Sequence, residues 1–138
     1  MIFKEIERNL FTMPPNYHLV HCISSDASMH KGIADIMKRK FRLIQLREMK
    51  LYIGRCYKVN RVFNLVTKDK YYSKPTYTSM KRSLESLREQ CIELNISKLA
   101  MPTIGCGLDK LEWDKVKEII EELFKEIDIE IVVCHYDT

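Results

Sequence analysis

Glycine and proline are scarce in this chain, with four of each among 138 residues. This scarcity excludes collagen-like repeats and the Pro/Gly-rich low-complexity sequences that stay disordered. No apolar run approaches the roughly 18 residues that a membrane-spanning helix requires. The N-terminus carries acidic residues early and lacks the long apolar stretch of a signal peptide, so we expect an intracellular protein, cytoplasmic or nuclear.

The spacing of the cysteines excludes two further classes of protein. The five cysteines are odd in number and contain no Cys-x-x-Cys pair, which argues against both a disulfide framework and a zinc site. We therefore expect reduced thiols, no metal and no cofactor. Cys91 and Cys134 fall on apolar faces and are expected in the core, whereas Cys106 lies in a glycine-containing loop where a ligand can approach.

The rest of the composition is typical of one globular domain. Hydrophobic residues make up 46% of the chain, and no linker or repeat divides it, so we expect residues 1–138 to form a single monomeric domain. The formal net charge of +4 suits a polyanionic partner, but it also simply aids solubility.

Hydrophobic periodicity predicts strands alternating with helices. We expect strands near residues 2–6, 17–23, 55–59, 61–67, 98–101 and 129–135. Helices are expected from about Gly32, over residues 76–95 and from about Trp113, each with an apolar stripe at spacings of three and four. The stripe of the long helix comprises Tyr77, Met80, Leu84, Leu87, Cys91 and Leu94. This order predicts an α/β fold in which helices sandwich a sheet.

The most informative stretch is residues 103–109, Thr-Ile-Gly-Cys-Gly-Leu-Asp, between an expected strand and an expected helix. A loop of this kind lets bare backbone N–H groups approach a phosphate, and the helix N-terminus adds positive potential. A tight turn that needs positive φ is the alternative interpretation. A second strand-to-helix loop leads to Gly32. Because such loops converge at one edge of a parallel sheet, together they predict a site for a nucleotide-like diphosphate.

Three polar residues allow two interpretations each. Lys74 precedes Pro75, which favours a helix start, and a helix N-terminus opposes a positive charge by roughly 0.3 to 1 kcal/mol. Lys74 is therefore either a solvated loop lysine, beside Lys68 and Lys70, or an uncharged amine available as a nucleophile. Asp109 precedes Glu112 by three residues and is either a helix cap or a proton-shuttling carboxylate. The hydroxyl of Ser24 either hydrogen-bonds backbone groups at the end of its strand or binds a ligand.

Three ordered motifs resemble the macrodomain family, in the branch typified by terminal ADP-ribose protein glycohydrolase. They are His-Cys-Ile-Ser at 21–24 with Met29 and Gly-Ile-Ala at 32–34, then Lys-Pro-Thr-Tyr at 74–77, then Met-Pro at 101–102 with residues 104–109 and Trp113. The resemblance spans nearly the whole chain. It implies a three-layer α/β/α sandwich with a mixed central sheet, and ADP-ribose bound at the strand ends with its diphosphate between the Gly32 and Gly105 loops.

The resemblance also implies roles for individual residues. The residue matching Lys74 attacks the anomeric carbon of the distal ribose, and the residue matching Asp109 helps to resolve the lysine adduct. The implied reaction removes mono-ADP-ribose from acidic side chains of proteins, and O-acetyl-ADP-ribose is a further implied substrate. The implied substrate-binding positions are Asn9, Leu10, Ser24, Met29, Gly32, Ile33, Thr103, Ile104, Gly105, Cys106, Gly107 and Leu108.

Two positions depart from the family pattern. Asn9 stands where the family commonly has an aspartate that accepts the adenine amino group, and a neutral amide predicts weaker adenine binding. His30 stands where a glycine is usual, and its side chain can crowd the diphosphate or add a cation.

Other functions remain open on the sequence. A reader that binds ADP-ribose without turnover is one, and the presence of both Lys74 and Asp109 argues against it. Removal of ADP-ribose from nucleic acid, or processing of ADP-ribose 1''-phosphate, is another. RNA binding through Tyr71 and Tyr72 beside the neighbouring lysines is a third. We expect ADP-ribose and mono-ADP-ribosylated proteins as partners, with nucleic acid less favoured and no membrane.

Overall fold

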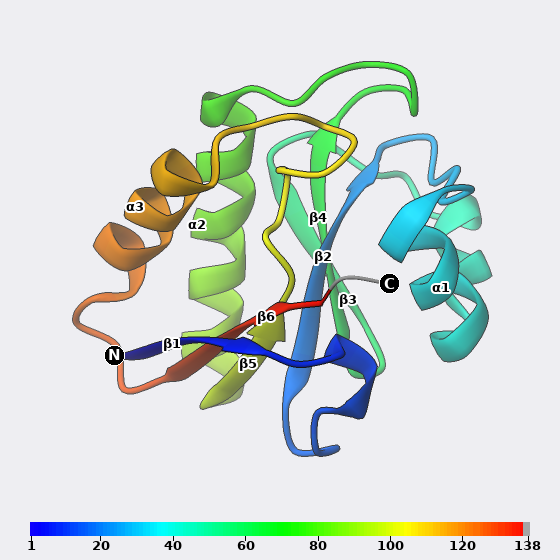
Figure 1. Ribbon diagram of the computed structural model, residues 1–138. Helices are drawn as coiled ribbons and strands as arrows, with labels where there is room; N and C mark the ends of the chain where they lie inside the picture. Colours follow the sequence, from blue (N-terminus) through cyan, green and yellow to red (C-terminus); the bar gives the residue numbers. More distant parts are fainter. Residues whose placement is uncertain (137–138) are drawn as a thin grey trace.

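The computed structural model describes residues 1–136, which form a six-stranded sheet with helices on both faces (Figure 1). The strands are β1 (Ile2–Glu7), β2 (His18–Ser24), β3 (Arg55–Val59), β4 (Val62–Lys68), β5 (Lys98–Met101) and β6 (Glu130–His135). The helices are α1 (Gly32–Phe41), α2 (Tyr77–Leu94) and α3 (Trp113–Phe124), with short 3-10 helices η1 (Leu10–Thr12) and η2 (Leu43–Glu48). All the predicted strands are confirmed to within one residue at each end.

The sheet is mixed, as predicted, with the strand order β1-β6-β5-β2-β4-β3. Only the β3–β4 hairpin is antiparallel, and the other neighbouring strands run parallel. The central strands β5, β2 and β4 are therefore parallel neighbours, and the loops that follow them leave the same edge of the sheet. Ligands of open α/β sheets bind at this kind of edge.

Two apolar layers hold the helices against the sheet. On one face, α2 and α3 pack against Phe63 and Leu65, and on the other face α1 and η2 pack against Val62 and Val66 (Figure 1). Strand β4 therefore contributes to both layers, which explains why its residues from 62 to 67 are all buried. A strand covered on both faces has an apolar run rather than an alternating pattern.

The predicted core stripe of α2 is largely confirmed. Met80, Leu84, Leu87 and Cys91 are buried, but Leu94, at the margin of the stripe, is 50% exposed. The sequence did not predict η2, where Leu43 and Leu46 are fully buried three residues apart. None of the helices in the described part of the chain combines the length and apolar character needed to cross a membrane.

The start of α2 fixes the position of Lys74. Thr76 is the N-cap, and it exchanges hydrogen bonds with Ser79 in a capping box, each side chain accepting from the other residue's backbone N–H at 3.0 Å. Pro75 thus lies before the cap rather than at the first helical position, and the helix begins at Tyr77. Lys74 stands just outside the helix, as predicted, in the loop that follows β4.

Candidate functional site

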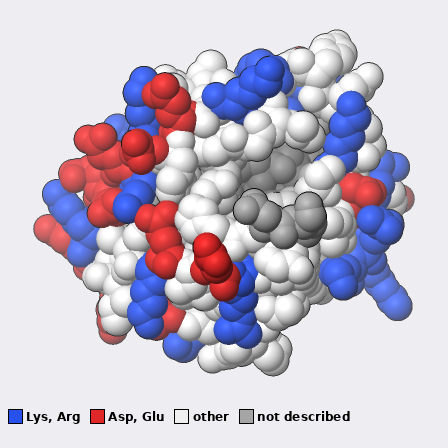
Figure 2. Space-filling model, viewed as in Figure 1, with Lys and Arg blue, Asp and Glu red and all other residues white. Residues whose placement is uncertain are grey.

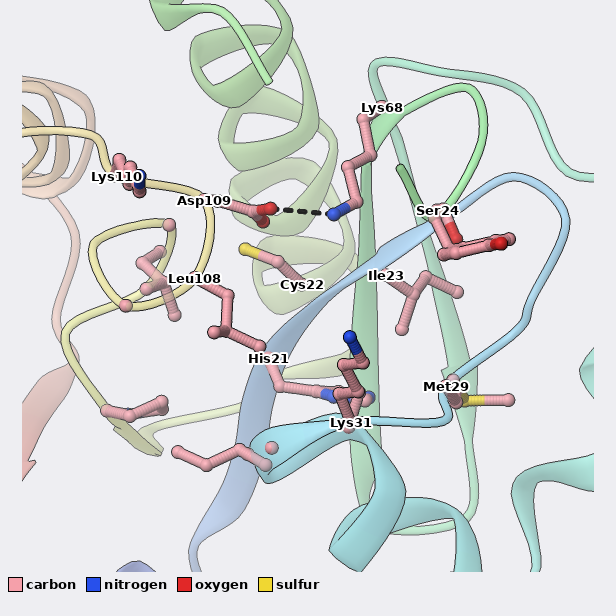
Figure 3. A pocket seen from close by; sticks show the side chains of 18 of the residues that line it. His21, Cys22, Ile23, Ser24, Met29, Lys31, Lys68, Leu108, Asp109 and Lys110 are labelled. Atoms are coloured by element: carbon pink, nitrogen blue, oxygen red, sulfur yellow. Dashed lines mark hydrogen bonds and ion pairs between the residues drawn. The ribbon is translucent and has the colours of Figure 1, made fainter. Parts of the chain in front are cut away.

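A cavity of about 670 Å³ opens at the edge of the sheet where β2, β4 and β5 end (Figure 3). Three segments form its walls, namely residues 21–34, residues 68–74 and residues 102–110. A volume of this size fits a small-molecule ligand. The predicted convergence of the two glycine loops is confirmed, because a Cβ added to Gly32 would lie only 3.8 Å from Leu108 Cδ1.

Most of the predicted site residues line this cavity. They are Ser24, Met29, Gly32, Ile33, Lys74, Thr103, Ile104, Gly105, Gly107, Leu108 and Asp109. Three predicted residues do not line it. Asn9 Oδ1 accepts a hydrogen bond from Phe11 N and caps η1, and Leu10 is buried in the core. Cys106 Sγ donates to Ile104 O and packs against the α2–α3 layer, and burial raises the pKa of its thiol to about 11.

Backbone N–H groups from both loops are available to an anion. Lys31, the N-cap of α1, makes no side-chain cap hydrogen bond, so the first turn of this helix presents open N–H groups at the cavity. In the second loop, the N–H groups of Gly105, Gly107 and Leu108 make no hydrogen bond within residues 1–136. Open amides beside a helix N-terminus attract phosphate groups.

The two loops carry unusual backbone conformations. Ala27, Met29 and Lys110 have φ values of 52°, 44° and 62°, in the left-handed region that side-chain-bearing residues rarely adopt. Gly32 and Gly105 have φ values of 60° and 74°. The tight-turn interpretation of Gly105 is therefore also correct. The Gly105 loop therefore combines a positive φ with a bare backbone at the cavity. Left-handed conformations at residues with side chains, such as Ala27, Met29 and Lys110, are strained, and such strain is frequent at binding sites.

An ion pair that the sequence did not predict crosses the cavity wall. Lys68 Nζ lies 2.6 Å from Asp109 Oδ1, and the two side chains are 14% and 16% exposed (Figure 3). The capping interpretation of Asp109 is wrong, because Glu112 is the N-cap of α3. Lys68 is also not a solvent-exposed lysine of the loop. It ends β4 and points at the loop after β5, a contact between residues 41 positions apart in the sequence.

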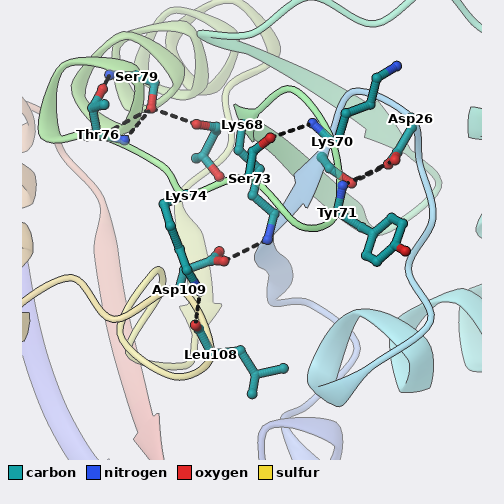
Figure 4. A network of polar contacts seen from close by, with 12 residues as sticks. Asp26, Lys68, Lys70, Tyr71, Ser73, Lys74, Thr76, Ser79, Leu108 and Asp109 are labelled. Carbon is teal, nitrogen blue, oxygen red and sulfur yellow. Dashed lines mark hydrogen bonds and ion pairs between the residues drawn. The ribbon is translucent and has the colours of Figure 1, made fainter.

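Lys74 also reaches the loop that follows β5. Its Nζ donates a hydrogen bond of 3.0 Å to Leu108 O, the carbonyl of the residue before Asp109 (Figure 4). The amine therefore lies at the cavity with a neutral backbone acceptor as its partner. Both lysines of this wall are thus anchored to residues 108 and 109.

Asp26 ties the first loop to the loop that follows β4. It accepts hydrogen bonds from Ser24 Oγ, Ser28 N and Tyr71 N (Figure 4). Although partial burial opposes it, these bonds hold the pKa of Asp26 below its usual value. Because the hydroxyl hydrogen of Ser24 is directed to Asp26, a ligand finds Ser24 Oγ as an acceptor.

Aromatic residues form the rim of the cavity. The rings of His30 and Tyr71 meet edge to face at 4.6 Å between centroids, and those of Tyr71 and Tyr72 at 5.2 Å. The two tyrosines are 51% and 69% exposed. His30, the departure noted in the sequence, therefore belongs to this rim. The sequence showed Tyr71 and Tyr72 only as an aromatic pair beside lysines.

Charge is distributed unevenly over the molecule. Acidic side chains gather mainly over α3 and basic side chains over the side of α1 (Figure 2). Residues 31–50, which include α1 and η2, contain seven Lys or Arg and only two Asp or Glu. A basic surface next to the cavity favours anionic ligands.

The comparison with known proteins identifies the family. The Macro domain family profile matches residues 20–120, which include all three walls of the cavity. This chain belongs to the Macro domain family. The sandwich of helices and mixed sheet is the macrodomain fold.

Relatives of this macrodomain cover nearly all of its length. ADP-ribose glycohydrolase OARD1 from Bos taurus is 40% identical over 133 residues, which are 93% of this chain and 88% of the relative. The macrodomain of Thermus aquaticus DarG superposes with a TM-score of 0.86 at 24% identity, covering 97% of this chain and 98% of that one. Thermosipho africanus DarTG in complex with ADP-ribose gives a TM-score of 0.80 at 19% identity, covering 98% of this chain and 41% of that one.

Proposed function

We propose that this macrodomain binds ADP-ribose and hydrolyses its ester bond to acidic side chains of proteins, with Lys74 as nucleophile. The observation that carries the proposal is the placement of the Lys74 amine and the Asp109 carboxylate on one cavity wall, opposite the open amides of α1. The relative named an ADP-ribose glycohydrolase, and a neighbouring structure that holds ADP-ribose, support the ligand and the reaction class.

The diphosphate fits between the two glycine loops. The open N–H groups of the first turn of α1 and those of Gly107 and Leu108 belong to segments that line the same cavity, and each set can hold one phosphate. This arrangement directs the distal ribose towards the wall that carries Lys74 and Asp109. Binding energy from the diphosphate then positions the anomeric carbon near the amine.

The reaction has two steps. The lone pair of Lys74 Nζ forms a bond to the anomeric carbon, and the bond from that carbon to the acceptor carboxylate breaks, so that the carboxylate leaves with the bonding electrons. Asp109 accepts the proton that the amine gives up. Water then attacks the anomeric carbon as the carbon–nitrogen bond breaks. Asp109 gives its proton back to the departing amine, the proton lost by the water passes to solvent, and ADP-ribose is released. An acetyl ester of ADP-ribose is open to the same two steps.

The test is release of ADP-ribose from a protein mono-ADP-ribosylated on glutamate. Lys74→Ala should abolish release while leaving the affinity for ADP-ribose within a few fold, since its amine reacts with the ribose rather than holding the phosphates. Asp109→Ala should slow turnover and let the covalent Lys74 adduct accumulate, which intact-protein mass spectrometry detects. Lys81→Ala, at an exposed lysine of α2 outside the cavity, is the matched control.

Two outcomes would replace the proposal. Full hydrolysis by Lys74→Ala would rule out the lysine mechanism. Tight ADP-ribose binding by the unaltered protein without turnover of any ADP-ribosylated substrate would make it a reader.

A second candidate is hydrolysis of ADP-ribose from nucleic acid. The observation in its favour is the cluster of aromatic rings at the cavity rim, formed by His30 and the exposed Tyr71 and Tyr72. The segment that follows, residues 31–50, is rich in Lys and Arg. Aromatic rings stack on unpaired bases, and lysines follow the phosphate backbone. Running the release assay on ADP-ribosylated single-stranded DNA in parallel decides between the acceptors. Tyr72→Ala should then impair release from DNA more than release from protein.

A further inference from the structure

Two lysines face the same cavity wall with different partners. Lys68 makes an ion pair with Asp109, whereas Lys74 donates to the neutral carbonyl of Leu108 (Figure 4). Within residues 1–136, no carboxylate forms an ion pair with Lys74 Nζ. Asp109 therefore pairs with Lys68, and Lys74 contacts only the backbone of the preceding residue.

The ion pair of Lys68 and Asp109 is well suited to hold that carboxylate. Its 2.6 Å distance marks a charge-assisted hydrogen bond, and both side chains are more than four-fifths buried. Salt screens such a pair less than an exposed one. Asp109 is also the single carboxylate among the described residues that line the cavity, so Lys74 has no other acid to pair with there.

We propose that Lys68 is a positioning residue, which occupies the Asp109 carboxylate so that this carboxylate does not form an ion pair with Lys74 before the attack. The inference rests on the proposed role of Lys74 as nucleophile. An amine attacks only through its lone pair, which the ammonium form lacks. A carboxylate that pairs with an amine stabilises the ammonium form. Without the Lys68 cation, Lys74 is a replacement partner for Asp109, because its amine already contacts the preceding residue.

Other titratable and charged groups surround the two lysines. They are His21 and Cys22 from β2, His30 and Lys31 from the loop before α1, Tyr71 and Tyr72 from the loop after β4, and Lys110 after Asp109. None of these side chains carries a carboxyl group. Burial, with a smaller effect of Asp109, raises the pKa of the Cys22 thiol to about 12, so this thiol stays neutral. The competition therefore involves Lys68, Lys74 and Asp109.

The first test is the pH profile of ADP-ribose release for Lys68→Met and Lys68→Arg. Lys68→Met should be at least about tenfold slower at pH 7 and should regain activity as the pH rises. Lys68→Arg keeps a cation on Asp109 and should keep the wild-type profile. Release by Lys74→Ala at each pH gives the background hydrolysis of the ester, which is subtracted. The affinity for ADP-ribose should stay within a few fold in both variants.

The double variant Lys68→Met/Asp109→Asn isolates the mechanism. It has no carboxylate left to pair with Lys74, so its profile should coincide with that of Asp109→Asn alone. This variant also removes the buried pair as a whole, which protects against misfolding caused by one unpaired charge. An unshifted profile in Lys68→Met, with ADP-ribose binding weakened instead, would overturn the inference and make Lys68 a phosphate ligand.

A second measurement does not depend on turnover. Trace labelling with acetic anhydride, read for Lys74 by peptide mass spectrometry, reports its unprotonated fraction at each pH. Labelling of Lys74 at pH 7 should fall about tenfold in Lys68→Met and recover in the double variant, whereas labelling of Lys81 stays unchanged. Unchanged labelling of Lys74 overturns the inference. If labelling of Lys74 falls in Lys68→Met but the unaltered protein turns over no substrate, the effect of Lys68 on Lys74 is supported. The proposed function is overturned instead.

Discussion

Acid should destabilise this macrodomain through His21, a buried histidine in the middle of the sheet. His21 is 2% exposed, and its Nε2 lies 2.5 Å from Asn64 Oδ1 on the neighbouring strand. The Asn64 amide nitrogen donates to Tyr57 O and Val62 O, so Oδ1 must be the acceptor and His21 Nε2 the donor. Protonation would therefore add a hydrogen to Nδ1, which is buried without a partner in the described chain.

The size of the effect follows from the difference in pKa between the folded and unfolded states. Burial lowers the pKa of His21 from 6.5 to about 4, and the hydrogen bond with Asn64 opposes this only in part. Between these values the unfolded chain binds the proton and the folded chain does not, so stability falls as the pH falls below 6.5. The free energy of unfolding should be about 2 kcal/mol lower at pH 5 than at pH 7 from this residue alone.

Urea unfolding followed by circular dichroism at pH 7 and pH 5 measures this loss. His21→Gln keeps an amide donor for Asn64 without a titrating group, and it should lose about 2 kcal/mol less than the wild type between the two pH values. Partial burial, with Lys58 and Arg61, also lowers the pKa of His18, so His18→Gln should reduce the loss by a smaller amount. An equal loss in His21→Gln and in the wild type would refute the reasoning.

Two further predictions concern ADP-ribose affinity, measured by calorimetry. Gly107→Glu should weaken binding by roughly 100-fold, because like charges meet at the diphosphate, whereas Gly107→Gln has the same shape and should lose far less. A Cβ at Gly107 meets no atom within 4 Å, so equal losses in the two variants would contradict a phosphate site there. Asn9→Asp should strengthen binding modestly if residue 9 receives the adenine amino group, since a charged acceptor is stronger and caps η1 equally well. Equal or weaker binding would remove Asn9 from the adenine site.

Local patterns in the sequence were sufficient for the six strands, the three α-helices and the place of the cavity, but not for the 3-10 helices η1 and η2. Strand β4 is recognisable because both of its faces are covered, and α2 because its apolar residues recur at helical spacing. The meeting of the Gly32 and Gly105 loops follows from parallel strands, whose ends lie at one edge. The resemblance of three short motifs to the macrodomain family then named the ligand and the two residues of the proposed chemistry.

Only the tertiary structure decided which partner each polar side chain has. The three-residue spacing of Asp109 and Glu112 looks like a capping box, yet the carboxylate turns to Lys68, which lies 41 positions earlier in the sequence. Cys106 lies between two site glycines but packs into the core, because the turn at Gly105 directs its side chain away from the cavity. Local spacing describes one segment, whereas the partner of a charged group depends on which loops meet in space. The sequence therefore located the site, and the packing of the loops around the sheet determined its electrostatics.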